Sequence, residues 1–281
     1  MALAHESPAL SVLPADLQTA RFLLEQVYFD EGNFPGSPIT TELIQMNLDH
    51  VERVRRNALE IASGEGLDVN VIELAAILHD ISKLDHREST SGGIDTWHHH
   101  SRGASLARKI LLVHLHKKIA LADRIARIVE THSDIPFIRR FWTASYQADP
   151  PAPKTEEQMA LRDADVIDML WVGGMAKIVH FRQVPGSDFF NEDGGDIQNA
   201  IVSARRSFEE ASRMLSLKTA RYLALERIET VQSFFSSLVP VRDMADFHRV
   251  YDEFVDEHKS ATSTHSHRWN TMLTGESGAG R

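Results

Sequence analysis

The chain has 281 residues, of which 42% are hydrophobic and 25% are charged, and its formal net charge at pH 7 is −10. This composition fits a globular protein with a sizeable core, built as one large domain or two small ones. The negative charge argues against a general nucleic-acid or anionic-membrane surface. The absence of cysteine excludes disulfides, iron–sulfur clusters and thiolate zinc sites.

No apolar run approaches the roughly 18–20 residues that a membrane span requires. The opening residues, MALAHESPALSVLPADLQ, lack a basic segment followed by an apolar one, so we expect no secretory signal. These features together favour a cytoplasmic protein and argue against a membrane or a nucleic-acid polymer as its partner.

Apolar residues recur at helical spacing along nearly the whole chain, and no segment reads as a strand. Asp68 is the expected N-cap of one helix, and Thr155 and Gln158 form a capping box at the start of another. Helices are predicted at about 16–29, from Thr40 or Thr41 to the Gly64/Gly66 pair, from Asp68 through Asp80, at 100–113, 116–131, 155–172 and 175–182, and two or three more over 197–258.

The sequence therefore predicts an all-α fold with four parts. They are an N-terminal helix and loop (1–39), a helical core (40–182), a C-terminal helical extension (183–258) and a flexible tail (259–281).

The stretch AAILHDISK, residues 75–83, places a histidine and an aspartate side by side in a helix that is apolar almost all round. We expect His79 and Asp80 to lie in the middle of this buried helix. Burying an ionised carboxylate costs several kcal/mol unless something pairs with it. A metal ion is one partner that would offset this cost.

Other residues that could bind a metal fall inside predicted helices or at their ends, namely His50, His99, His132 and Asp165. Imidazole and carboxylate ligands without thiolates suit Mn, Fe, Zn, Ni or Co. A lone buried histidine is more often a hydrogen-bonded core residue, but five helical segments that each supply such a ligand favour a shared metal centre. Asp163 and Asp168 are expected to be helix caps or surface charges.

The order His…His-Asp…Asp, with HVERVRRNALEIA before it and AAILHDISK at its centre, resembles the HD superfamily of metal-dependent phosphohydrolases over about residues 40–182. The resemblance implies a single HD-domain helical bundle with extra C-terminal helices. It also implies a first metal bound by His50, His79, Asp80 and Asp165. Asp165 is preferred over Asp168 because the family's last motif, here ADVID, has its first aspartate on the metal.

The dinuclear subset of this superfamily has two further histidines, which HHSRGASLA and IVETHSD would supply as His99 and His132. His99 matches that spacing better than His100, and Asp80 would bridge the two ions. The resemblance implies two divalent metals, with iron or manganese favoured and zinc, cobalt or nickel as alternatives. Ser133 and the missing Gly-Tyr-Pro tripeptide separate the chain from the cyclic-di-GMP branch, so small stand-alone HD hydrolases resemble it most.

The implied activity is hydrolysis of a phosphate ester or anhydride of a small molecule, with a nucleotide favoured, by a metal-bound hydroxide. Asp80 and Lys83 are the expected catalytic residues, because Lys83 projects over the edge of the helix that His79 and Asp80 share. Lys83, Arg102 and Arg139 are the expected contacts to the substrate phosphate. Weaker candidates are Arg140 at the entrance and, as proton carriers, Asp85 and His86.

Two alternatives remain open from the residues alone. The same ligand set can hold a mixed-valent di-iron centre that cleaves a C–C or C–P bond with O₂, and EQVYFDEGNFPG would then form a lid with Tyr28 and Glu31 near the metals. The second alternative is a non-catalytic nucleotide sensor. The amphipathic stretches FFSSL and DFHRVYDEFV are candidates for pairing two copies of the chain as a homodimer.

Overall fold

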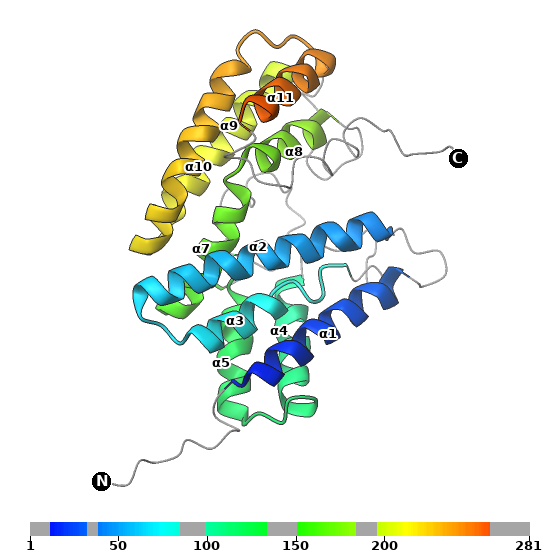
Figure 1. Cartoon of the computed structure of the whole chain (residues 1–281), viewed down its shortest axis with the longest axis vertical. Coiled ribbons are helices and arrows are strands. Elements are labelled where there is room, and N and C mark those ends of the chain that lie inside the picture. The colour runs from blue at the N-terminus through cyan, green and yellow to red at the C-terminus, as the bar shows by residue number, and fades with distance from the viewer. Residues whose placement is uncertain (1–11, 33–38, 85–98, 134–150, 184–195, 259–281) are drawn as a thin grey trace. The chain divides into compact units, whose positions relative to one another are not determined.

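The computed structural model describes residues 12–32, 39–84, 99–133, 151–183 and 196–258. These residues contain ten helices and no strand, which confirms the predicted all-α fold (Figure 1). None of the described helices is long and apolar enough to cross a membrane. Residues 33–38 of the predicted N-terminal helix and loop, and the predicted tail at 259–281, lie outside the described residues.

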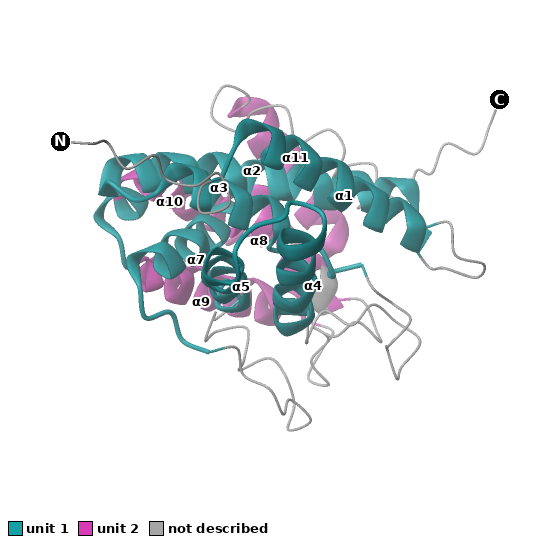
Figure 2. Cartoon of the chain, turned by 90° about the horizontal axis from the view of Figure 1, so that it is seen from below, with its two compact units in different colours: residues 1–134, 146–168, 216–221 teal, residues 135–145, 169–215, 222–281 magenta. Residues whose placement is uncertain are grey.

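The chain forms two compact units, coloured teal and magenta in Figure 2. Unit 1 comprises Met1–Asp134, Tyr146–Asp168 and Ser216–Arg221. Unit 2 comprises Ile135–Ser145, Met169–Leu215 and Tyr222–Arg281.

Unit 1 is built around α3 (Val69–Leu78), which packs against α1, α2 and α5. Seven of its ten residues are buried, which explains why the sequence of this helix is apolar almost all round. Its other helices are α1 (Pro14–Gly32), α2 (Thr41–Glu65), α4 (His99–Val113), α5 (Ile119–Glu130) and nearly all of α7 (Glu156–Met169).

The ends of these helices follow the local sequence signals. The side chain of Thr40 accepts a hydrogen bond from the Leu43 N–H at 3.2 Å, and that of Asp68 accepts one from Val71 at 3.2 Å, as expected for N-caps. Thr155 and Gln158 form the predicted capping box, with reciprocal hydrogen bonds of 3.1 and 3.3 Å. Gly66 ends α2 with a φ of 70°, a left-handed conformation that favours glycine.

The prediction that His79 and Asp80 lie within a helix is wrong, because α3 ends at Leu78 and His79 is its C-cap. Asp80 lies in a turn closed by hydrogen bonds from Ile81 N–H to Leu78 O and from Lys83 N–H to Asp80 O. The apolar pattern continues past the helix because this turn is itself buried, with Ile81 0% exposed. Apolar spacing reports burial here rather than helical conformation.

Unit 2 contains α8 (Val172–Gln183), α9 (Ile197–Met214), α11 (Met244–Glu257) and most of α10 (Lys218–Ser237). The ring of Phe234 lies at its centre, with ring centroids 6.3 Å from Phe247, 6.0 Å from Tyr251 and 5.3 Å from Phe254. These aromatic side chains come from the two stretches considered for subunit pairing, and they are buried within one chain. A homodimer through these helices stays a proposal, and it would have to use other side chains.

Candidate metal centre

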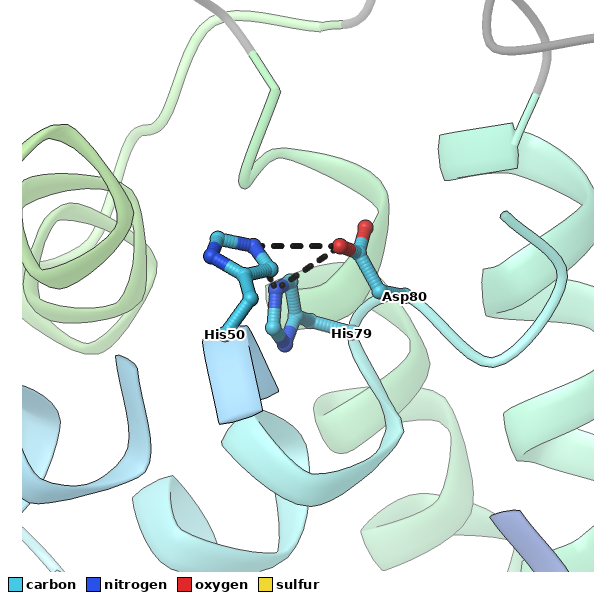
Figure 3. Close-up of side chains that lie close together, drawn as sticks. All are labelled: His50, His79 and Asp80. Atoms are coloured by element: carbon cyan, nitrogen blue, oxygen red, sulfur yellow. Dashed lines mark hydrogen bonds and ion pairs between the residues drawn. The ribbon is translucent and has the colours of Figure 1, made fainter. Parts of the chain in front are cut away.

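Unit 1 brings together five of the predicted metal ligands from four places in the fold. His50 lies in α2, His79 and Asp80 in the turn after α3, His99 at the first residue of α4, and His132 just after α5. Figure 3 shows His50 and His79 pointing toward the carboxylate of Asp80. Four imidazoles therefore converge on one buried carboxylate.

The two oxygens of Asp80 face two different pairs of histidines. Oδ2 lies 3.1 Å from His50 Nε2 and 3.4 Å from His79 Nε2. Oδ1 lies 3.3 Å from His99 Nε2 and 3.4 Å from His132 Nε2. Each oxygen and its two nitrogens lie within 4.8 Å of one another, so each trio could hold one metal ion, with Asp80 shared between them.

The remaining predicted ligand, Asp165 of α7, lies beside His50, with 3.4 Å between its Oδ1 and His50 Nε2. It does not belong to either compact trio. His100, the neighbour of His99, is 3% exposed and also lies outside both trios.

The second ring nitrogen of two of these histidines has a backbone carbonyl as its partner. The Nδ1 of His79 lies 2.7 Å from Ala76 O, and the Nδ1 of His132 lies 2.5 Å from Val129 O. Because a carbonyl oxygen only accepts, both Nδ1 atoms carry the proton and donate it. Their Nε2 atoms then present lone pairs toward Asp80, which is the orientation that a metal ligand needs.

This arrangement fits a bound cation. The Nε2 atoms of His79 and His132 are hydrogen-bond acceptors, and they face the oxygens of a carboxylate, which are acceptors too. His79 and Asp80 are 0% exposed and His132 is 1% exposed, and the facing atoms are 3.4 Å apart, a distance that leaves no room for a water molecule between them. A metal ion between the facing lone pairs turns this unfavourable packing of acceptors into a set of ligands.

Asp168 supports the site, so the expectation that it is a helix cap or a surface charge is wrong. It is 4% exposed, its Oδ2 accepts from His50 Nδ1 at 2.8 Å, and its carboxylate binds the guanidinium of Arg53 through bonds of 2.6 and 3.0 Å. Burial alone would raise the pKa of Asp168, but His50 and Arg53 outweigh it and hold the pKa far below its ordinary value. Asp168 therefore stays ionised and orients the His50 ring.

Two helical spacings could have revealed this role. Asp168 is three residues after Asp165 and Arg53 is three residues after His50, so each shares a helix face with a predicted ligand. Asp163 is not a surface charge either, because it is 0% exposed. Its Oδ2 accepts from the backbone N–H of Ser216 at 2.8 Å and of Leu217 at 2.9 Å, just before α10.

Lys83 forms an ion pair with Asp80 Oδ2, and its side chain is 28% exposed. Burial lowers the pKa of Lys83, but the carboxylates of Asp80 and Asp165 raise it by more. The net pKa lies above the ordinary value, so Lys83 stays an ammonium at neutral pH. Burial would raise the pKa of Asp80, but the ammonium of Lys83 holds it well below its ordinary value. Asp80 and Lys83 are therefore both charged at neutral pH.

A glycine lets α4 approach this turn closely. A Cβ atom at Gly103 would lie 3.2 Å from the backbone oxygen of His79, so a larger residue would push α4 away. The hydroxyl of Ser82 donates to the His99 carbonyl at 2.8 Å and joins the turn to the start of α4. These two contacts help to hold His99 beside Asp80.

The predicted phosphate contacts stay predictions. Arg102 lies in the first turn of α4, three residues after His99. Arg139, Arg140, Asp85 and His86 lie outside the described residues. Tyr28 of α1 is 0% exposed, and burial raises the pKa of its hydroxyl well above the ordinary value.

Known proteins share the fold of this chain, and a family model covers the part that holds the site. The HD-domain family matches residues 47–170, a span that contains all six predicted ligands. The crystal structure of Bacillus subtilis YpgQ in complex with ADP is 20% identical, covers 82% of this chain and 97% of that chain, and has a TM-score of 0.53. An HD-superfamily hydrolase from Bacillus thuringiensis is 16% identical, covers 80% and 95%, and has a TM-score of 0.52. A search of curated protein sequences found no match.

Proposed function

Because residues 47–170 match the HD-domain family, we propose that this chain is a metal-dependent phosphohydrolase acting on a phosphate ester or anhydride of a small molecule. The observation that carries the proposal is the position of Asp80, whose Oδ2 faces His50 and His79 while its Oδ1 faces His99 and His132. One carboxylate between two histidine pairs suits two adjacent divalent cations. When bound, such cations lower the pKa of water and stabilise charge on phosphoryl oxygens.

Charge supports a phosphate as the substrate group. The carboxylates of Asp80, Asp165 and Asp168 face the cations Lys83 and Arg53, so the residues alone carry a small negative charge. Two divalent ions would reverse its sign and favour an anionic substrate. Lys83 is exposed enough to contact that anion, and its ammonium would oppose the charge that develops on phosphorus-bound oxygen.

The proposed substrate class is a nucleotide, and its support is that YpgQ, a protein of similar fold, has been crystallised with ADP. The proposed metals are two divalent ions, iron or manganese, because imidazole and carboxylate ligands without thiolate suit both. Arg102 and Arg139 are proposed as further phosphate contacts.

The test is phosphate release by the purified protein after loading with Mn²⁺ or Fe²⁺, measured over a panel of nucleoside mono-, di- and triphosphates. We expect Lys83→Met to lower kcat by roughly 10²-fold while two metals per chain remain bound. Lys118→Met is the control, since Lys118 is an exposed lysine of the same unit. A protein that binds two metals but releases no phosphate from any compound would overturn the proposal.

The same preparation separates hydrolysis from the oxygenase chemistry considered above. Low-temperature EPR of the iron-loaded protein, in air and after partial reduction, detects a mixed-valent di-iron signal. A signal that O₂ quenches only in the presence of a phosphonate, together with O₂ consumption, would replace the hydrolase assignment.

A further inference from the structure

The N-terminal helix reaches the metal centre through one buried side chain. Tyr28 of α1 donates its hydroxyl hydrogen to the backbone oxygen of Asp80 at a distance of 2.8 Å, across 52 residues of sequence. Tyr28 is 0% exposed, and α1 packs against α3, the helix that leads into Asp80. The contact therefore joins α1 to the backbone of the residue that both histidine pairs share.

The Asp80 peptide lies where the backbone has little support from helical hydrogen bonds. Because α3 ends at Leu78, Asp80 lies beyond the last helical turn, where carbonyl groups lack the usual intrahelical partner. One lone pair of the Asp80 oxygen accepts from the Lys83 N–H at 2.8 Å. The Tyr28 hydroxyl takes the other, so both acceptor positions of this carbonyl are filled.

The orientation of the Asp80 peptide matters because each of the two carboxylate oxygens of Asp80 faces a different pair of histidines. These two oxygens lie 3.1 to 3.4 Å from four imidazole nitrogens. Rotation of the peptide would move both oxygens together and would change both trios at once. A hydrogen bond that fixes the peptide therefore acts on the whole centre.

We propose that Tyr28 is a positioning residue of the metal centre, whose hydroxyl fixes the Asp80 peptide and thereby aims the shared carboxylate at both histidine pairs. Tyr28 acts through Asp80, and its hydroxyl contacts a backbone atom rather than a ligand atom. The inference rests on the metal centre of the proposed function but not on the reaction, so its test uses metal binding without substrate.

The test compares Tyr28→Phe with Tyr251→Phe by calorimetric titration of the metal-free protein with Mn²⁺. Tyr251 is a matched control, since it is 1% exposed, lies in unit 2 and has a hydroxyl without a hydrogen-bond partner among the described residues. We expect Tyr28→Phe to weaken Mn²⁺ binding by about 10- to 100-fold, the usual effect of losing a group that orients a ligand. Tyr251→Phe should leave the affinity unchanged.

A rescue variant separates the hydrogen bond from packing. p-Aminophenylalanine at position 28 keeps the ring and restores an N–H donor, so it should recover most of the Mn²⁺ affinity. If Tyr28→Phe lowers the melting temperature but binds Mn²⁺ as the wild type does, or if the amino variant binds as weakly as the phenylalanine variant, the hydroxyl has only a structural role and the proposal is wrong.

A second measurement applies even where Tyr28→Phe fails to fold. In a crystal structure of the wild-type protein grown with Mn²⁺, Tyr28 Oη should lie within hydrogen-bond distance of Asp80 O, and a separation beyond roughly 3.5 Å would overturn the proposal. The two proposals fail separately. A wild-type protein that binds Mn²⁺ without releasing phosphate refutes the hydrolase and leaves the role of Tyr28 intact.

Discussion

Of the seventeen polar or charged side chains buried among the described residues, sixteen belong to unit 1 and one, Ser207, belongs to unit 2. The Ser207 hydroxyl donates to the Ser203 carbonyl of its own helix, so it needs no partner from elsewhere in the fold. The core of unit 2 is otherwise aliphatic and aromatic, with Phe208, Phe234 and Phe247 among its largest fully buried side chains.

The core of unit 1 therefore contains the buried polar groups of the metal centre, whereas the core of unit 2 consists of side chains that only pack. Burying a carboxylate or an ammonium destabilises a fold unless partners or a metal compensate, whereas burying an aromatic ring stabilises it directly. Unit 1 buries such charged groups around Asp80, and the part of unit 2 that the structure describes has no comparable cluster of buried charged side chains. Substitutions around Asp80 in unit 1 should therefore change metal binding and activity, and those in the core of unit 2 should change stability alone.

The strongest test of this contrast is Asp80→Asn. Asp80 faces both histidine pairs, so we expect loss of both metals and a fall in activity greater than the roughly 10²–10³-fold caused by removing a single electrostatic donor. Elemental mass spectrometry of the purified variant and a phosphate-release assay measure the two effects. Asp30→Asn, a change at an exposed position of α1, is the control. An active Asp80→Asn protein with two bound metals would contradict the assignment of this centre.

The converse test removes packing from unit 2. Phe234 is 0% exposed and lies among Phe247, Tyr251 and Phe254, so Phe234→Ala should lower the free energy of unfolding by about 3–5 kcal/mol. Phe22→Ala, at a residue that is 59% exposed, should change it by less than about 0.5 kcal/mol. Denaturant unfolding measures both. Metal content per folded chain should be unchanged, and its loss in Phe234→Ala would break the division between the units.

The helices could be predicted because local signals determine where they begin and end, whereas the convergence of the ligands was predicted from the resemblance to the HD superfamily. The caps at Thr40 and Asp68 involve side chains and N–H groups three residues apart, so they are visible in the sequence. The turn at His79 and Asp80 could not be distinguished from a helix, because Ile81 and Leu84 are buried and continue the apolar spacing beyond it. Its conformation depends on tertiary burial, which periodicity does not resolve.

The groups that support the ligands were harder to predict for a different reason. The partners of Asp168 are more than one hundred residues away in the chain, and Tyr28 meets Asp80 across 52 residues. Such contacts follow from how helices pack, and no local propensity reports them. The helical spacing from Asp165 to Asp168 was the available signal, and it outlines a rule: residues three or four positions from a predicted ligand deserve testing as its support.

Asp168→Asn tests that rule and gives a smaller effect than loss of Asp80. The amide cannot balance the charge of Arg53 or hold the His50 ring as firmly, so we expect metal affinity to fall about 10- to 100-fold. Asp163→Asn is a matched control on the same helix, since Asp163 is equally buried but binds the backbone N–H groups of Ser216 and Leu217. It should lower the melting temperature and leave metal affinity unchanged. Equal metal affinities in both variants would show that Asp168 does not orient His50.

The smallest expected effect concerns a pair of histidines in unit 2. The rings of His180 in α8 and His248 in α11 are stacked with centroids 6.0 Å apart, and burial together with His248 lowers the pKa of His180. A folded-state pKa below the unfolded value of about 6.5 means that the unfolded chain binds more protons as the pH falls. The stability that neutral His180 contributes is therefore present above about pH 6.5 and is lost below it.

Thermal unfolding at pH 7.5 and pH 5.5 measures this loss in the wild type and in His180→Gln. The metal centre is intact in both proteins, so its own pH dependence cancels in the comparison. The wild type should lose more stability on acidification than the variant, by no more than about 2 °C in melting temperature because His180 is only partly buried. Equal losses would mean that the acid sensitivity of the protein comes from unit 1, where the buried charged groups lie, and would sharpen the contrast between the two cores.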